Sequence, residues 1–148
     1  MPYAARILVP TDFSPLSTLA IEHAIALASV CRASIHLMHV QADARGHVAD
    51  AERRLAGLAS RCHAEAIVVT TQVCAGQPAT AIVRTAADRA VDLIVIGTHG
   101  RQGVAHLMLG SVAEHVVRTA PCPVLTVRGL VPERVGQPEA AAWVLLPE

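Results

Sequence analysis

The fold of this chain is decided by Leu93-Ile94-Val95-Ile96-Gly97-Thr98-His99-Gly100-Arg101-Gln102-Gly103-Val104-Ala105-His106-Leu107-Met108-Leu109-Gly110-Ser111. The four apolar residues at its start predict a buried strand, and Ser111 marks the start of a helix. The glycines between them allow an anion to approach the backbone closely, because glycine has no Cβ. The helix start adds unpaired N–H groups and a positive dipole end. The stretch therefore predicts a loop that holds nucleotide phosphates.

Outward from this stretch, short apolar runs alternate with amphipathic segments. This order predicts a parallel sheet covered by helices on both faces. We expect a single α/β domain over residues 1–128, with a doubly wound, Rossmann-like, five-stranded parallel sheet in the order 3-2-1-4-5. The predicted strands are 6–10, 34–40, 66–73, 91–96 and 124–127, and the predicted helices are 14–30, 49–62, 78–89 and 111–120.

Two helix starts carry clear capping signals. Ser14 followed by Pro15 predicts a hydroxyl N-cap with proline at the first helical position. Ser111 and Glu114 have the spacing of a capping box. Ser111 therefore has two interpretations, a pure N-cap or a phosphate ligand, and the two are compatible because a phosphate can use backbone donors.

Composition excludes several classes of function. The 148 residues suffice for one domain with its own core, and 53% of them are hydrophobic. The formal net charge is zero, which argues against nucleic-acid binding. All 12 basic residues are arginines, so the chain can form neither a P-loop with its lysine nor a Schiff base.

The cysteines and histidines point to the cytoplasm and away from a metal site. The four cysteines show neither a C-x-x-C pair nor zinc spacing, as expected for free thiols in a reducing compartment. We expect no signal peptide and no membrane span. His36 and His39 stand three apart on a predicted strand and so face opposite sides.

The predicted topology brings two distant segments together. In an open parallel sheet, ligands bind where the strand order reverses, here between strands 1 and 4. Pro10-Thr11-Asp12 follows the first of these strands, and the loop from Gly97 follows the other. Asp12 can accept a hydrogen bond from a ribose hydroxyl or an adenine amino group, or it can form an Asx turn that starts the next helix.

With these segments placed, the chain resembles the universal stress protein family from Ala5 to Arg128, and in particular its ATP-binding branch. The resemblance rests on 7–14, on Gly97-x-x-Gly100 followed by nine residues and Gly110-Ser111, and on the closing segment 121–127. It implies a cytoplasmic stress-response protein that forms homodimers through the last strand.

The resemblance also assigns roles to residues around adenine and phosphates. It implies an apolar slot for the base at Pro10, Thr11, Val40 and Ile96, with Val40 beside adenine. The backbone of Gly97, Gly100, Gly110, Val112 and Ala113 and the hydroxyl of Ser111 would hold phosphates, with Arg101 adding charge and His99 shape. We expect Mg²⁺ to arrive on the phosphates of ATP and no metal site built by protein ligands.

The sequence leaves the mode of action open. A nucleotide-responsive regulatory dimer is the leading hypothesis, because no nucleophile–base set is apparent. A slow ATP hydrolase, a ligand-free dimeric interaction module and a cyclic AMP binder are the alternatives. The uncharged strand 124–127 is predicted to be a sheet edge that pairs with a second copy. The tail 129–148 is expected to dock on its own domain or on the dimer partner.

Overall fold

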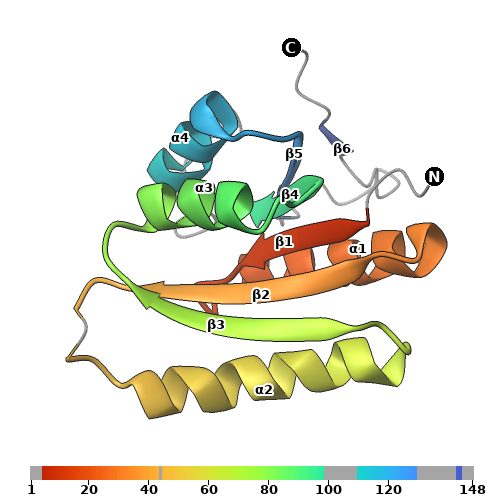
Figure 1. Cartoon of the computed structure of the whole chain (residues 1–148), viewed down its shortest axis with the longest axis horizontal. Helices are drawn as coiled ribbons and strands as arrows, with labels where there is room; N and C mark the ends of the chain where they lie inside the picture. Colours follow the sequence, from red (N-terminus) through yellow and green to blue (C-terminus); the bar gives the residue numbers. More distant parts are fainter. Residues whose placement is uncertain (1–4, 44, 99–109, 130–142, 145–148) are drawn as a thin grey trace, which may run out of the picture.

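The protein is a single layer of sheet with helices on both of its faces (Figure 1). The structure, a computed structural model, describes residues 5–43, 45–98, 110–129 and 143–144. Its elements in chain order are β1 (Arg6–Pro10), α1 (Pro15–Cys31), β2 (Ser34–Gln41), α2 (Val48–Ala64), β3 (Val69–Ala75), α3 (Pro78–Asp88), β4 (Leu93–Gly97), α4 (Ser111–Thr119), β5 (Val124–Val127) and β6 (Trp143–Val144).

The parallel sheet confirms the predicted fold. The strand order is β3-β2-β1-β4-β5-β6, and the first five strands are all parallel, in the predicted order 3-2-1-4-5. The chain proceeds from β1 outward to β3 and then returns to β4 on the other side of β1. The order therefore reverses between β1 and β4, which places a crevice at the carboxyl ends of these two strands.

Each face of the sheet has its own apolar core. Small side chains of α1, such as Ala20 and Ala24, pack with Leu55 of α2 on one face. Ile82 of α3 and Val116 of α4 pack on the other face. Alanine on α1 lets that helix approach the sheet closely, so that its N-terminus lies next to the end of β4.

The sixth strand corrects the prediction that 124–127 forms the sheet edge. Trp143 and Val144 of the tail pair antiparallel with Val127 and Thr126. β6 thus pairs with Thr126 and Val127, the second half of β5. The uncharged edge that suggested a dimer is shared with a segment of the same chain.

Two strands begin later than predicted, for one physical reason. Ala66 and Ala90 adopt left-handed backbone conformations, with φ of 58° and 49°. The next residues, Ile67 and Val91, then donate their N–H groups back to Cys62 and Ala86. These apolar residues close the preceding helices in the manner of a Schellman motif and do not start strands.

Candidate functional site

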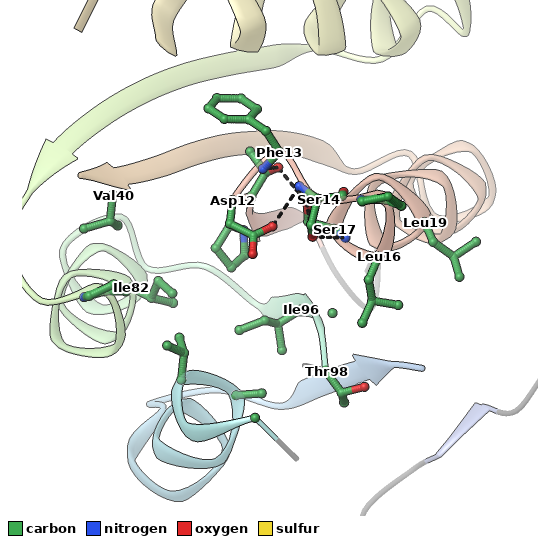
Figure 2. Close-up of a pocket in the computed structure, with 18 of the residues that line it drawn as sticks. Asp12, Phe13, Ser14, Leu16, Ser17, Leu19, Val40, Ile82, Ile96 and Thr98 are labelled. Carbon is green, nitrogen blue, oxygen red and sulfur yellow. Dashed lines mark hydrogen bonds between the residues drawn. The ribbon is translucent and has the colours of Figure 1, made fainter. Parts of the chain in front are cut away.

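A pocket of about 920 Å³ opens at the carboxyl ends of β1 and β4, at the reversal of strand order (Figure 2). This volume is typical of a small-molecule site, for which about 300–1,000 Å³ is usual. Ten of the residues predicted to contact a nucleotide line it, and they come from β1, β2, β4 and α4 and the turns beside them. They are Pro10, Thr11, Asp12, Val40, Ile96, Gly97, Gly110, Ser111, Val112 and Ala113.

Three further predicted contacts, His99, Gly100 and Arg101, lie outside the described residues. Their proposed roles in holding phosphates stay predictions. Within the described residues, the site consists of the β1–α1 turn, the ends of β2 and β4, and the first turn of α4.

Hydrogen bonds within the protein hold the turn from β1 to α1 in place. The buried hydroxyl of Thr11 lies 3.0 Å from the Ser17 hydroxyl and accepts a bond from the Phe13 N–H, also at 3.0 Å. The Thr11 N–H donates to Met38, and its carbonyl accepts from the Nδ1–H of His39 at 2.8 Å. Every polar group of Thr11 is thus paired within the protein, so this residue offers a ligand its apolar surface.

Asp12 combines a structural bond with an acceptor aimed at the pocket. Its Oδ1 accepts from the Ser14 N–H at 2.9 Å, which makes the Asx turn that was one of its predicted interpretations. Partial burial would raise the pKa of the Asp12 carboxyl, but hydrogen bonds from Ser14 and Ser17 outweigh it and lower the pKa. The carboxylate is therefore charged at neutral pH, and its second oxygen can accept from a ligand hydroxyl.

The close packing of α1 explains why residue 97 is a glycine better than a need for loop flexibility does. A Cβ at this position would lie 3.1 Å from Cγ and 3.2 Å from the carbonyl oxygen of Leu16. The next residue, Thr98, is buried and donates its N–H to Val127 of β5 at 2.9 Å. The end of β4 is therefore fixed between α1 and β5, and only glycine fits there without a shift of the helix.

The first turn of α4 corrects the predicted capping box. Gly110 is the N-cap, with an extended backbone (φ −60°, ψ 157°), and Ser111 is the first helical residue. Glu114 does not close a box, because its carboxylate pairs with Arg118 one turn later at 2.6 Å. Glu114 also makes the first N–H bond of the helix, to Gly110 at 2.9 Å. The helix therefore leaves the N–H groups of Ser111, Val112 and Ala113 at the pocket without an intrahelical partner.

The sequence interpretation missed a stacked group on the α2 side of the pocket. The Phe13 ring lies 4.4 Å from the His39 ring, centroid to centroid, and the Arg54 guanidinium carbon lies 5.1 Å from the centre of the Phe13 ring. Figure 2 shows Phe13 directed away from Ile96 and Ile82. The one sequence signal for this group was that Phe13 directly follows Asp12. Nothing comparable pointed to Arg54, because it lies on a different element. Leu16, Ser17, Leu19, Pro78, Ile82, Thr98 and Gly129 also line the pocket and were not predicted as site residues.

The histidines of β2 serve structural roles on opposite faces of the sheet. His36 is buried, with Nδ1 2.6 Å from the Thr70 hydroxyl and Nε2 2.8 Å from Oε1 of Gln72. Burial lowers the pKa of His36, in keeping with a neutral ring that donates from Nε2. Within the described part of the chain, no cluster of three or more histidine, cysteine or acidic side chains is arranged to hold a metal ion.

The thiols do not contribute to the site. All four cysteines are free, and none of them lines the pocket among the residues described. Burial raises the pKa of the Cys62 and Cys122 thiols, which keeps them protonated and unreactive. None of the helices in the described segments could span a bilayer, because none is both long and apolar enough.

Comparisons with known proteins agree with this fold. Residues 4–128 match the universal stress protein family. The chain is 32% identical over 139 residues to universal stress protein MJ0531 of Methanocaldococcus jannaschii, with 83% of this chain and 81% of that protein covered.

Two solved structures share the fold. Protein MJ0577, a universal stress protein of the same archaeon, superposes with a TM-score of 0.78 at 28% identity, over 88% of this chain and 99% of that one. A universal stress protein in complex with cAMP superposes with a TM-score of 0.71 at 25% identity, over 84% of this chain and 97% of that one. The family match over most of the sequence, the identity to MJ0531 and the common sheet topology show that this chain belongs to the universal stress protein family.

Proposed function

We propose that this protein binds an adenine nucleotide, ATP, in the pocket at the β1/β4 reversal and acts as a nucleotide-responsive regulatory protein. The observation that carries the proposal is the first turn of α4. Three consecutive N–H groups, from Ser111 to Ala113, point their positive ends at a pocket whose opposite wall holds the Asp12 carboxylate. Such a helix start binds an anion, and the acid binds hydroxyl groups.

The residues fit the parts of ATP in a definite order. The N–H groups of α4 and the Ser111 hydroxyl would bind phosphates, and Asp12 would accept from a ribose hydroxyl. Pro10, Val40 and Ile96 would pack against the base. Mg²⁺ would be held by phosphates and water, which is its usual mode with nucleotides.

Relatives support a nucleotide as the ligand. One structural neighbour is a universal stress protein in complex with cAMP, which combines an adenine base, a ribose and a phosphate. The spacing Gly97-x-x-Gly100, nine residues, Gly110-Ser111 resembles the ATP-binding branch of the family. A cyclic monophosphate and a triphosphate place different charge at α4, so their relative affinities are part of the test.

We also propose a cytoplasmic homodimer as the responsive unit. The four free thiols fit a reducing compartment. β5 carries no charged residue, and its first half, at Val124 and Leu125, is where a second copy would pair. A bound nucleotide contacts Gly97 at the end of β4, and β4 pairs directly with β5, so the pocket and the dimer edge are one strand apart.

Calorimetry and light scattering on one sample test both parts. We expect ATP to bind with a Kd on the order of micromolar, and Gly110→Val to weaken it about tenfold or more. The extended backbone of Gly110 accepts valine without strain, so the variant should fold. Asp12→Ala should weaken binding less.

Light scattering should give the mass of a dimer, and we expect this mass to change when ATP is added. Absence of binding of ATP, AMP and cAMP at millimolar concentration would refute the nucleotide proposal, and a monomer at all concentrations would refute the dimer.

A further inference from the structure

Arg54 of α2 reaches the pocket from outside the set of residues that a nucleotide is expected to contact. Among the described residues that line the pocket, Arg54 is the one cation and Asp12 the one anion. Its guanidinium lies over the Phe13 ring at 5.1 Å, a distance typical of a cation–π contact. The pocket thus has a positive group on the α2 side, in addition to the N-terminus of α4.

The position of Arg54 is built into the turn that carries Asp12. Phe13 has a left-handed backbone, with φ of 63°, which turns its ring out toward α2. The ring stacks on His39, and His39 is fixed by the bond from Nδ1–H to the Thr11 carbonyl at 2.8 Å. Arg54 therefore lies on a platform that the pocket wall itself holds in place.

The charges around Arg54 leave it free to bind an anion. Its Nε lies 3.3 Å from Oδ2 of Asp50, and Arg53 shares the same carboxylate through Oδ1, also at 3.3 Å. The group formed by Arg53, Arg54 and Asp50 carries a net charge of +1. The ion pair of Arg54 uses Nε, so its two Nη groups remain to form bonds with a phosphate.

We propose that Arg54 is a specificity-determining residue that binds a second phosphate of the ligand, carried on the ribose at the 2′ or 3′ position. The inference rests on the proposed nucleotide site, in which Asp12 faces the ribose and α4 binds the 5′-phosphates. A ligand with anionic groups on both sides of the ribose would join α4 and Arg54 across the pocket. The preferred ligand class is then an adenine nucleotide with a ribose phosphate, and AMP lacks this second contact.

Calorimetry with three probes tests the inference: AMP, adenosine 2′,5′-bisphosphate and adenosine 3′,5′-bisphosphate. We expect the intact protein to bind one bisphosphate about five- to tenfold more tightly than AMP, a modest gain because the Arg54 side chain is 58% exposed. Arg54→Gln should remove this preference, so that AMP and both bisphosphates bind this variant with similar affinities. Arg54→Lys should keep part of it, since it retains the charge without the planar group.

Arg53→Gln is the matched control. Arg53 shares Asp50, lies on the same helix and is more exposed, at 78%, but it is absent from the described pocket lining. This variant removes the same charge from the same region, so it should keep the preference. If AMP binds and neither bisphosphate binds more tightly, or if both glutamine variants lose the preference equally, the role of Arg54 is refuted while the nucleotide site stands. If AMP, ATP and both bisphosphates all fail to bind, the proposed function itself is refuted.

Discussion

The two walls of the pocket differ in whether their polar groups form hydrogen bonds within the protein. In the β1–α1 turn, Thr11, Asp12 and Ser17 all form hydrogen bonds within the protein. At the start of α4, the helix leaves the N–H groups of Ser111 and Val112 without an intrahelical partner. The β1–α1 turn uses most of its polar groups in bonds within the chain, whereas the first turn of α4 directs its N–H groups at the pocket.

This difference separates stability from ligand binding within one site. Breaking a hydrogen bond in the β1–α1 turn leaves a polar group without its partner and lowers the free energy of unfolding. Removing a donor from the start of α4 should cost the fold little, because that donor has no partner within the helix, but it should weaken the binding of a ligand. Lining a pocket is therefore not enough to make a residue a ligand contact, and substitutions on the two walls can distinguish the two roles.

The largest expected effect is that of Gly97→Ala, which tests whether Gly97 belongs to the scaffold although it lies on the ligand side. The new Cβ would lie 3.2 Å from the carbonyl oxygen of Leu16, in the first turn of α1, where the backbone has little freedom to shift. We expect a loss of about 2–3 kcal/mol in the free energy of unfolding, measured with denaturant.

Gly129→Ala is its control. A Cβ at Gly129 would approach the same residue, Leu16, but would touch only the end of its side chain, at 3.4 Å. This is an ordinary contact, so the stability should change by less than about 0.5 kcal/mol. Equal effects of the two substitutions would show that the close approach of α1 to β4 is not what requires glycine.

The next effect compares the two walls directly, with one hydroxyl removed from each. Thr11→Val deprives the Phe13 N–H and the Ser17 hydroxyl of a partner, so the free energy of unfolding should fall by about 1–2 kcal/mol. The ATP affinity should stay within about threefold, because Thr11 offers the ligand apolar surface, which valine retains.

Ser111→Ala should give the reverse result. Ser111 is exposed and is the first helical residue, not the N-cap. Its loss should change stability by less than about 0.5 kcal/mol and weaken ATP about three- to tenfold. If Thr11→Val abolished ATP binding without loss of stability, the β1–α1 turn would bind the ligand directly, and the two walls would not differ in their roles.

The fold was predictable in its topology but not at two strand starts. Alternating apolar runs and helices predicted the sheet order, because parallel strands with right-handed crossovers allow few arrangements. Ile67 and Val91 read as strand residues because they are apolar, yet they cap helices. Glycine usually marks such a helix end, whereas here Ala66 and Ala90 take the left-handed conformation. The pairing of β6 with β5 also escaped prediction, because a two-residue strand has no periodicity to detect.

The site was predictable where topology alone brings residues together. The ends of β1 and β4 meet whatever their side chains are, so Asp12 and Gly97 could be placed in one pocket from the strand order. Arg54 could not, because its position depends on the left-handed turn at Phe13 and on the stack with His39. Ser111 was misassigned by one position, since serine in a capping-box spacing is a stronger N-cap signal than the preceding glycine.

The smallest effect is expected for Asp12, which bonds the turn through one carboxylate oxygen and can bind a ligand through the other. Asp12→Asn keeps an oxygen that can accept from the Ser14 N–H, so at neutral pH stability should change by less than about 1 kcal/mol.

The carboxyl has a pKa lowered from its ordinary value of 3.8, by hydrogen bonds from Ser14 and Ser17 that outweigh partial burial. The unfolded chain therefore takes up this proton at a higher pH than the folded chain does. The carboxylate stabilises the fold above pH 3.8, and this contribution is lost as the pH falls through the folded pKa. Urea unfolding at about pH 5 and about pH 3 should show the wild-type protein losing stability relative to Asp12→Asn. A difference between the two proteins that does not depend on pH would mean that the turn does not bind the charged form. Asp12 would then resemble the N–H groups of α4, as a group that serves the ligand and not the stability of the fold.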